Sequence, residues 1–189
     1  MIVGNGDIAT VIRDGGLDKD KFIFFCSGVS NSSEIRESEY QREIDLLWGQ
    51  DRSKRLVYFG SLSIFYSDTR YTRHKRKMEF LVKGSFEHHT IVRMGNITWG
   101  SNPHTLINFI RNKIRNREPF EIQDVYRYVV DKEEFLHWVD LIPPWNSEIN
   151  ISGRKMKVRD IVKQYCYPWG SLDAIIERNN SEQKLSLCL

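Results

Sequence analysis

The chain has 189 residues, of which 40% are hydrophobic and 28% are charged. These proportions are typical of a soluble globular protein and exclude a disordered tail, a collagen-like chain and a fibrous chain. The net charge of +3 is too small to indicate nucleic acid or a membrane surface as a partner. No apolar run approaches the roughly 18 residues of a membrane span, and the start of the chain predicts no secretory signal. At about 150 residues per domain, the length predicts one domain.

The three cysteines, Cys26, Cys166 and Cys188, lie far apart and form no C-x-x-C pair. An odd and scattered set favours free thiols in a reducing compartment, so we expect a cytoplasmic protein. A metal site would need clustered Cys, His or carboxylate side chains. His88 and His89 are adjacent, and adjacent side chains of a strand point to opposite faces of the sheet. The sequence therefore predicts no metal site.

Short apolar runs alternate with helical patterns along the chain, which predicts an α/β fold with a parallel sheet. The predicted strands are residues 1–3, 22–26, 56–59, 90–94, 126–130 and 149–151. The second of these is apolar throughout, which is typical of a strand that is covered on both faces.

The predicted helices follow these strands in turn. One begins at a Ser32 or Ser33 cap and ends near Trp48, because apolar side chains recur there at helical spacing and Gly49 supplies a stop. Gly84 is expected to end a second helix, and Pro103 to begin a third. The helices after the first are predicted over residues 71–82, 103–115, 133–141 and 158–165.

The first motif with chemical content is Gly4-x-Gly6-x-x-Ala9, which stands directly after the first strand and before a helix. Its glycines allow a tight turn and a close approach of the backbone to a phosphate, which the N–H groups of the helix N-terminus would bind. On its own the pattern is a weak signal, and a plain glycine-rich turn explains it equally well.

The second motif is Tyr71-x-x-x-Lys75, ten residues after Ser61. Residues four apart share one face of a helix, so a phenol and an ammonium group meet there, and the nearby Lys⁺ favours the phenolate. A serine hydroxyl at the preceding strand end would hydrogen-bond a substrate carbonyl. A lone Y-x-x-x-K is a common chance match, and the alternative is a solvated helix face within the basic run 73–77.

Taken together and in order, several segments make the sequence similar to the extended short-chain dehydrogenase/reductase family. The resemblance is to its NAD-dependent epimerase/dehydratase type, which acts on nucleotide sugars. The segments are MIVGNGDIA (1–9), FIFFCSGVSN (22–31), LVYFGSLSIF (56–65), YTRHKRKMEFLV (71–82), IVRMGNITWG (91–100), DVYRYVVD (124–131) and INISGRKMKVRDIVKQY (149–165). No single segment decides the resemblance, whereas their common order supports it.

The resemblance implies a three-layer, Rossmann-like parallel sheet in a single domain over residues 1–189. Residues 97–170 would form a smaller substrate-binding lobe, and residues 171–189 an irregular tail. Because family members commonly pair the two corresponding helices, it also implies a homodimer through helices 34–48 and 71–82.

The resemblance further implies a role for each matching residue. Tyr71 would be the general acid/base, and Lys75 would favour its phenolate and hold the nicotinamide ribose. Ser61 is the better match to the catalytic hydroxyl, with Ser63 as the second choice. Residues in contact with NAD or NADP would be Gly4, Asn5, Gly6, Asp7, Ile8, Ala9, Cys26, Ser27, Gly28 and Lys75. Substrate contacts would come from Ser63, Asn96 and Arg127, since a guanidinium binds a diphosphate bidentately. A turn residue for Asn96 and a surface ion pair for Arg127 are equally good explanations.

The sequence departs from the family pattern between Ala9 and Phe22, where residues 10–21 stand in place of two strands and their helices. The family's sheet order is 3-2-1-4-5-6, so a chain truncated in this adenosine-binding half has its first strand at an edge. The acids of the link, Asp14, Asp18 and Asp20, lie in a short connection rather than at a strand end. A right-handed connection to the next strand would move the first helix to the other sheet face; otherwise the connection is exceptional.

Asp7 is a second departure, because an apolar residue is common at this position and an acid faces a bound pyrophosphate unfavourably. The resemblance favours an NAD(P)-dependent epimerase, reductase or dehydratase of nucleotide-linked sugars, of the kind that serves polysaccharide biosynthesis. The alternative is a degenerate, non-catalytic relative that acts as a binding or partner subunit. Nucleic-acid binding through the basic runs 73–77 and 111–117 is disfavoured, since no aromatic-basic motif accompanies them.

Overall fold

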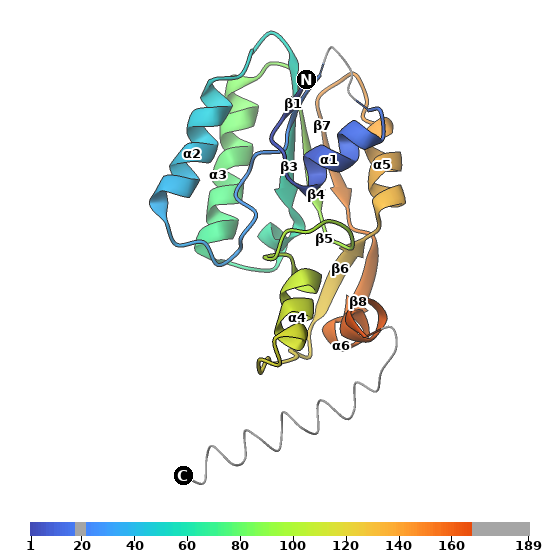
Figure 1. Cartoon of the computed structure of the whole chain (residues 1–189). Helices are drawn as coiled ribbons and strands as arrows, with labels where there is room; N and C mark the ends of the chain where they lie inside the picture. Colours follow the sequence, from blue (N-terminus) through green and yellow to red (C-terminus); the bar gives the residue numbers. More distant parts are fainter. Residues whose placement is uncertain (18–21, 168–189) are drawn as a thin grey trace.

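The computed structural model describes residues 1–17 and 22–167. Its main body is a sheet of five parallel strands in the order β1-β2-β3-β4-β7 (Figure 1). The strands of this sheet are β1 (Ile2–Val3), β2 (Phe22–Phe25), β3 (Arg55–Ser61), β4 (His89–Met94) and β7 (Ser147–Ile151). The predicted α/β fold, with a Rossmann-like parallel sheet and its first strand at an edge, is confirmed.

Helices cover both faces of the main sheet. The helices are α1 (Asp7–Asp14), α5 (Lys132–Asp140), α2 (Glu37–Trp48) and α3 (Arg70–Ser85). The first two pack on one face, where Ile12 and Phe135 are buried with Val57. The other two pack on the opposite face, where Leu47 and Met78 are buried. Both faces of the strands are therefore apolar, which explains why their sequences do not alternate.

The connection through α1 has an unusual hand. The connections β1–α1–β2 and β2–α2–β3 cross the sheet in the same direction but run on opposite faces (Figure 1). Because all these strands are parallel, the two connections have opposite hands. With α2 and α3 in the usual right-handed sense, the connection through α1 is left-handed. Of the two possibilities that the sequence left open, the structure shows the exceptional connection.

A smaller lobe lies below the main body at the carboxyl ends of its strands (Figure 1). It contains a three-stranded sheet in the order β5-β6-β8, which is covered by short helices. Its elements are β5 (Asn96–Ile97), α4 (Leu106–Arg115), β6 (Tyr126–Val130), β8 (Arg154–Lys157), α6 (Val158–Ile161) and the turn of π-helix η2 (Val162–Cys166). The polar segment RKMK at β8 carries no strand signal, so the sequence did not predict this strand.

Several predicted helix ends differ from the observed ones. Helix α2 begins at Glu37 rather than after Ser33, because a turn precedes it in which the Asn31 side chain accepts the Ser33 N–H. Helix α3 continues past Gly84 to Ser85.

Helix α4 begins at Leu106 rather than Pro103, since residues 102–105 form a hydrogen-bonded turn. Gly49 does end α2 as predicted. These shifts reflect local turn chemistry that competes with helical spacing.

Some predictions concern residues that the structure does not describe. Asp18, Asp20, Cys188 and the tail 171–189 lie outside the described residues. Among residues 1–17 and 22–167, no helix is both long and apolar enough to cross a bilayer.

Candidate active site

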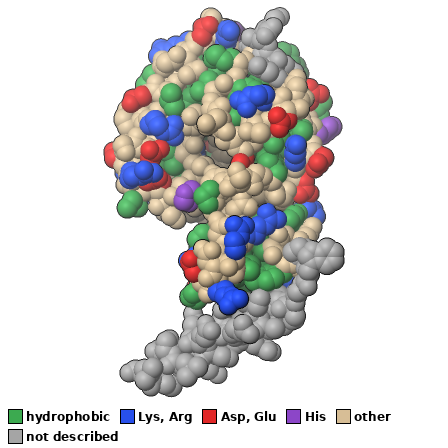
Figure 2. All heavy atoms as spheres, in the orientation of Figure 1, with side chains coloured by type: hydrophobic (Ala, Val, Ile, Leu, Met, Phe, Trp, Pro, Cys, Tyr) green, Lys and Arg blue, Asp and Glu red, His purple; other side chains and the backbone are tan. Residues whose placement is uncertain are grey.

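The predicted site residues gather at the carboxyl edge of the main sheet. Because β1, β2 and β3 are parallel, the loops that follow them meet at this edge, next to the small lobe (Figure 1). Figure 2 shows the main body hollowed in the face that carries α1. This arrangement is the usual place for a ligand in an open α/β sheet.

The glycine-rich loop after β1 is closely packed against the end of β2. Gly4 has a φ of +114°, and a Cβ at this position would lie 3.0 Å from the carbonyl carbon and oxygen of Cys26. Only glycine tolerates this conformation and this contact without strain. Gly6 is the N-cap of α1 and no side chain caps this helix, so backbone N–H groups of the first turn point out of it. The glycine-rich turn that the first motif predicts is therefore present, and phosphate binding at this turn stays a prediction.

Asp7, in the first turn of α1, is engaged by a distant loop. Its two carboxylate oxygens accept the backbone N–H groups of Ser101 and Asn102, each at 3.0 Å. The Asn102 side chain in turn donates to the Ser30 hydroxyl at 2.9 Å. Residues 98–105, which we call the strap, thus connect α1 with the loop that follows β2.

The two serines and the tyrosine lie on consecutive elements. Ser61 ends β3, and its hydroxyl lies 2.8 Å from that of Ser63 in the short 3₁₀ helix η1 (Leu62–Phe65). Helix α3 follows, with a capping box in which Thr69 and Thr72 hydrogen-bond reciprocally. Tyr71 lies in its first turn.

Lys75 lies one turn after Tyr71, and its ammonium nitrogen is 5.7 Å from the centre of the Tyr71 ring. The motif spacing therefore brings the phenol and the ammonium group close together, as the helical period requires.

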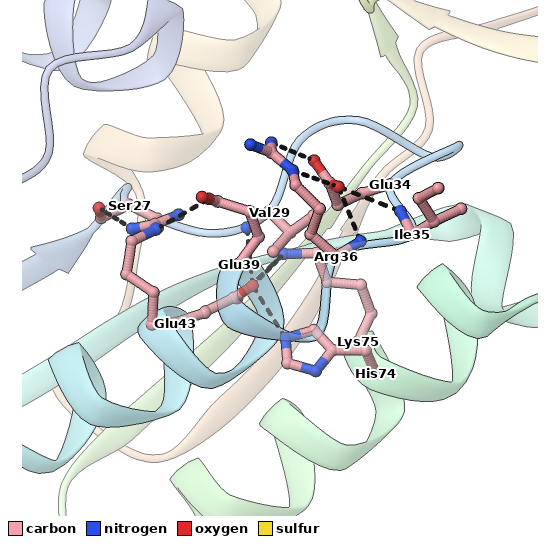
Figure 3. A network of polar contacts seen from close by, with 10 residues as sticks. Ser27, Val29, Glu34, Ile35, Arg36, Glu39, Glu43, His74 and Lys75 are labelled. Carbon is pink, nitrogen blue, oxygen red and sulfur yellow. Dashed lines mark hydrogen bonds and ion pairs between the residues drawn. The ribbon is translucent and has the colours of Figure 1, made fainter.

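The Lys75 side chain forms a buried ion pair. Its side chain is 3% exposed, and its ammonium nitrogen lies 3.0 Å from Oε1 of Glu43, which is fully buried in α2. Figure 3 shows Glu43 reaching from α2 toward His74 and Lys75 of α3. His74 Nε2 contacts the same carboxylate at 3.0 Å. The Lys75 charge is thus neutralised on the protein side, and its role as a ribose ligand stays a prediction.

Glu43 is the centre of a larger polar group, which we call the Glu43 cluster: Val29, Glu43, Tyr58, His74 and Lys75. The Glu43 carboxylate also accepts hydrogen bonds from the Val29 backbone N–H at 2.7 Å and from the Tyr58 hydroxyl at 2.8 Å. Burial by itself raises the pKa of Glu43, but Lys75, His74 and the Val29 N–H together outweigh it and lower the pKa to about 2. Burial and the Glu43 charge raise the pKa of Tyr58 well above its ordinary value.

Sequence reasoning missed Glu43, although a signal was present. Tyr40, Ile44 and Leu47 form the buried stripe of α2, and Glu43 stands on the same stripe. An acid on an apolar helix face must have a partner, because an unpaired buried charge is costly. The identity of that partner is not readable from α2 alone.

The loop after β2 packs onto the Glu43 cluster. A Cβ at Gly28 would lie 2.6 Å from the Lys75 ammonium nitrogen and 2.8 Å from Oε1 of Glu43. Arg42 donates to both the carbonyl and the hydroxyl oxygen of Ser27 at 3.2 Å. Burial raises the pKa of the Cys26 thiol far above its ordinary value, against the opposing charge of Arg13. These contacts hold the loop after β2 against helices α2 and α3.

The two predicted substrate residues of the small lobe, Asn96 and Arg127, differ in how far their side chains are engaged by other parts of the protein. The Asn96 side chain donates to the Tyr128 carbonyl at 3.0 Å, which ties β5 to β6. The Arg127 guanidinium lies 5.7 Å from the centre of the Tyr66 ring, directly after η1 in the chain. It donates to the Tyr126 carbonyl at 3.1 Å and to Gln123 Oε1 at 3.5 Å, and it pairs with no carboxylate within residues 1–17 and 22–167. Arg127 therefore lies beside Tyr66, close in the chain to Ser61 and Ser63, with its charge available.

No protein-family model and no curated protein matches this sequence. Solved structures do match its fold. The UDP-N-acetylglucosamine 4-epimerase of Methanobrevibacter ruminantium is 15% identical, with a TM-score of 0.59 over 79% of this chain and 61% of that chain. The dTDP-glucose 4,6-dehydratase of Streptomyces venezuelae, with NAD bound, is 12% identical, with a TM-score of 0.59 over 84% of this chain and 60% of that chain.

The UDP-glucose 4-epimerase of Thermus thermophilus in complex with NAD is also similar, at 12% identity and a TM-score of 0.57. The match covers 83% of this chain and 64% of that chain. This chain therefore spans less than two thirds of the length of each of these structures. These neighbours are epimerases and dehydratases of nucleotide sugars, and at such low identity the likeness establishes the fold.

Proposed function

We propose that this protein is an NAD(P)-dependent enzyme that modifies a nucleotide-linked sugar by an epimerase, reductase or dehydratase step. One observation carries the proposal. The Ser61–Ser63 hydroxyl pair, Tyr71 and Lys75 occupy consecutive elements at the carboxyl edge of the sheet, with the phenol and ammonium groups on one helix face. Structural neighbours that are nucleotide-sugar epimerases and dehydratases support the substrate class.

In this proposal Tyr71 takes up and returns the proton of the sugar hydroxyl, while Ser61 and Ser63 hydrogen-bond the same oxygen. NAD or NADP, when bound, supplies hydride transfer. The backbone of residues 4–9 would hold the cofactor phosphates. Arg127 binds the nucleotide diphosphate of the substrate. Figure 2 shows Lys and Arg side chains gathered where the small lobe joins the main body, which favours an anionic substrate.

A panel of ligands tests the proposal. We expect NADH or NADPH to bind in a fluorescence titration, and one of UDP-glucose, UDP-N-acetylglucosamine and dTDP-glucose to be converted in the presence of NAD, as seen by mass spectrometry and sugar chromatography. Absence of both cofactor binding at millimolar concentration and turnover of any sugar nucleotide would contradict the proposal.

The second candidate function is a non-catalytic binding or partner subunit. The observation that favours it is the ion pair between Glu43 and Lys75, because it neutralises the charge that would favour a Tyr71 phenolate. A protein of this kind would bind a sugar nucleotide in calorimetry without converting it. Binding without turnover thus separates the two candidates.

We also propose a homodimer through α2 and α3, in a cytoplasmic, reducing compartment that suits the free thiols Cys26 and Cys166. Phe80 of α3 is 75% exposed, and Trp48 at the end of α2 is 40% exposed. Apolar side chains on two adjacent helices favour a covering partner.

Light scattering after size exclusion tests this interface. We expect a dimer at micromolar concentration, and a monomer for Phe80→Glu. The matched control is Phe109→Glu, because Phe109 is 47% exposed on α4 of the small lobe. A wild-type monomer, or a Phe80→Glu dimer, would contradict the interface.

A further inference from the structure

The strap, residues 98–105, is fixed at several points around the glycine-rich loop. Asp7 of α1 holds it at Ser101 and Asn102, and Ser30 holds the Asn102 side chain. From the small lobe, the Asn108 side chain donates to the carbonyl oxygens of Gly100 and Asn102, at 3.1 Å and 3.0 Å. The strap is therefore an ordered crossing from the small lobe to the main body.

The contact between Asp7 and the strap is close enough to require glycine. Gly100 has a φ of +90°, and a Cβ there would lie 2.1–2.6 Å from the Cβ, Cγ and Oδ2 atoms of Asp7. Any other residue at position 100 would displace the Asp7 side chain or the strap, and either shift breaks their contact. Both carboxylate oxygens are used, so the contact joins one charged group to two N–H donors.

The Asp7 carboxylate also lies in the first turn of α1, where the helix dipole favours a negative charge. A phosphate at the glycine-rich loop would compete for the same positive helix end, and it would be repelled by the carboxylate at short range. The position therefore already holds an anion that belongs to the chain.

We infer that Asp7 is an internal anion that keeps the strap closed over the glycine-rich loop and competes there with the phosphate groups of a dinucleotide. This inference rests on the proposed function in placing those phosphates at the loop. It makes Asp7 and Gly100 determinants of which ligands the loop admits. Phosphate-containing ligands bind only when the contact between Asp7 and the strap opens.

The variant Asp7→Asn removes the charge, and its carboxamide offers one acceptor to two N–H donors. We expect Asp7→Asn to bind NADH and inorganic pyrophosphate at least about tenfold more tightly than wild type. The matched control is Asp14→Asn, which removes an exposed carboxylate from the other end of the same helix and should leave both affinities unchanged.

Hydrogen exchange tests the strap without any ligand. The Ser101 and Asn102 amides should exchange at least about tenfold faster in Asp7→Asn than in wild type or Asp14→Asn. Gly100→Ala should speed the same exchange while leaving the Asp7 charge in place. Its affinity for pyrophosphate should therefore rise less than that of Asp7→Asn.

The outcomes distinguish this inference from the proposed function. Equal NADH affinity in wild type and Asp7→Asn, or unchanged exchange of the two amides, overturns the inference while the proposed function stands. Tighter pyrophosphate binding by Asp7→Asn supports the inference, and it contradicts the proposed function if neither protein binds NADH or NADPH or converts a sugar nucleotide. If neither protein binds pyrophosphate, NADH or NADPH or converts a sugar nucleotide, both are wrong.

Discussion

Lys75→Met is expected to lower the free energy of unfolding by about 3–5 kcal/mol. The substitution leaves the fully buried Glu43 carboxylate without its main counter-charge, while His74, Tyr58 and Val29 remain as hydrogen-bond partners. Removing one partner of a buried pair is costly because the remaining charge has lost its hydration and no longer has a counter-charge that offsets this loss. Chemical denaturation at neutral pH, followed by circular dichroism, measures the change.

The control for this prediction is Lys77→Met, because Lys77 lies on the exposed side of the same helix. It should change stability by no more than about 0.5 kcal/mol. The double variant Glu43→Gln/Lys75→Met removes both charges and should recover much of the loss, since an apolar or neutral replacement of a whole pair is often tolerated. A Lys75→Met protein as stable as Lys77→Met would show that the ion pair does not stabilise the fold.

The Glu43 cluster also predicts how stability depends on pH. The pKa of Glu43 is lowered from an ordinary 4.5 to about 2 in the folded protein. A carboxyl group with a lowered pKa contributes stability that is present above the unfolded value and is lost as the pH falls through the folded value. Stability should therefore decline between about pH 4.5 and pH 2, and Glu43→Gln should lack this part of the decline. An identical acid profile for Glu43→Gln would contradict the prediction.

Tyr71→Phe is expected to lower turnover by about 10²–10⁴-fold while cofactor and sugar-nucleotide binding stay close to those of wild type. The phenol is the group that we propose moves the substrate proton, and phenylalanine keeps the ring without the hydroxyl. The assay is conversion of whichever sugar nucleotide the wild-type protein accepts, measured together with calorimetric affinities so that binding and chemistry are separated.

Tyr126→Phe is the matched control, since Tyr126 is 53% exposed on β6 of the small lobe. Unchanged turnover in Tyr71→Phe would refute the role of Tyr71. Equal losses in both variants would indicate a general effect on folding or handling rather than on proton transfer.

Within the described residues, the sequence by itself determined the elements whose signal is local. The apolar run at β2 predicted a strand covered on both faces, and its four residues are half-buried or buried. The spacing of Tyr71 and Lys75 predicted a shared helix face, because the helical period depends only on neighbouring residues. The glycine at position 4 likewise predicted a tight turn, and its positive φ confirms that turn, whereas its predicted approach to a phosphate stays a prediction.

Other features depended on contacts that no local pattern contains. Lys75 meets Glu43 across 32 positions of sequence, and the Y-x-x-x-K spacing cannot show which acid neutralises the lysine. Asp7 meets Ser101 across 94 positions, so its unusual charge was readable while its partner was not. The short polar strand β8 forms because β6 pairs with it, not because its residues favour extension.

The face occupied by α1 shows the same division most clearly. The short link after this helix predicted β1 at the sheet edge. The rule of right-handed connections left two alternatives: either α1 lies on the opposite face of the sheet, or its connection is an exception to the rule. Burial of Ile12 beside Phe135 of α5 decided for the exception. Periodicity and turn chemistry act within a few residues, so the sequence by itself determines them. The pairing of buried charges and the sheet face that a helix covers depend on distant segments, so only the tertiary structure decides them.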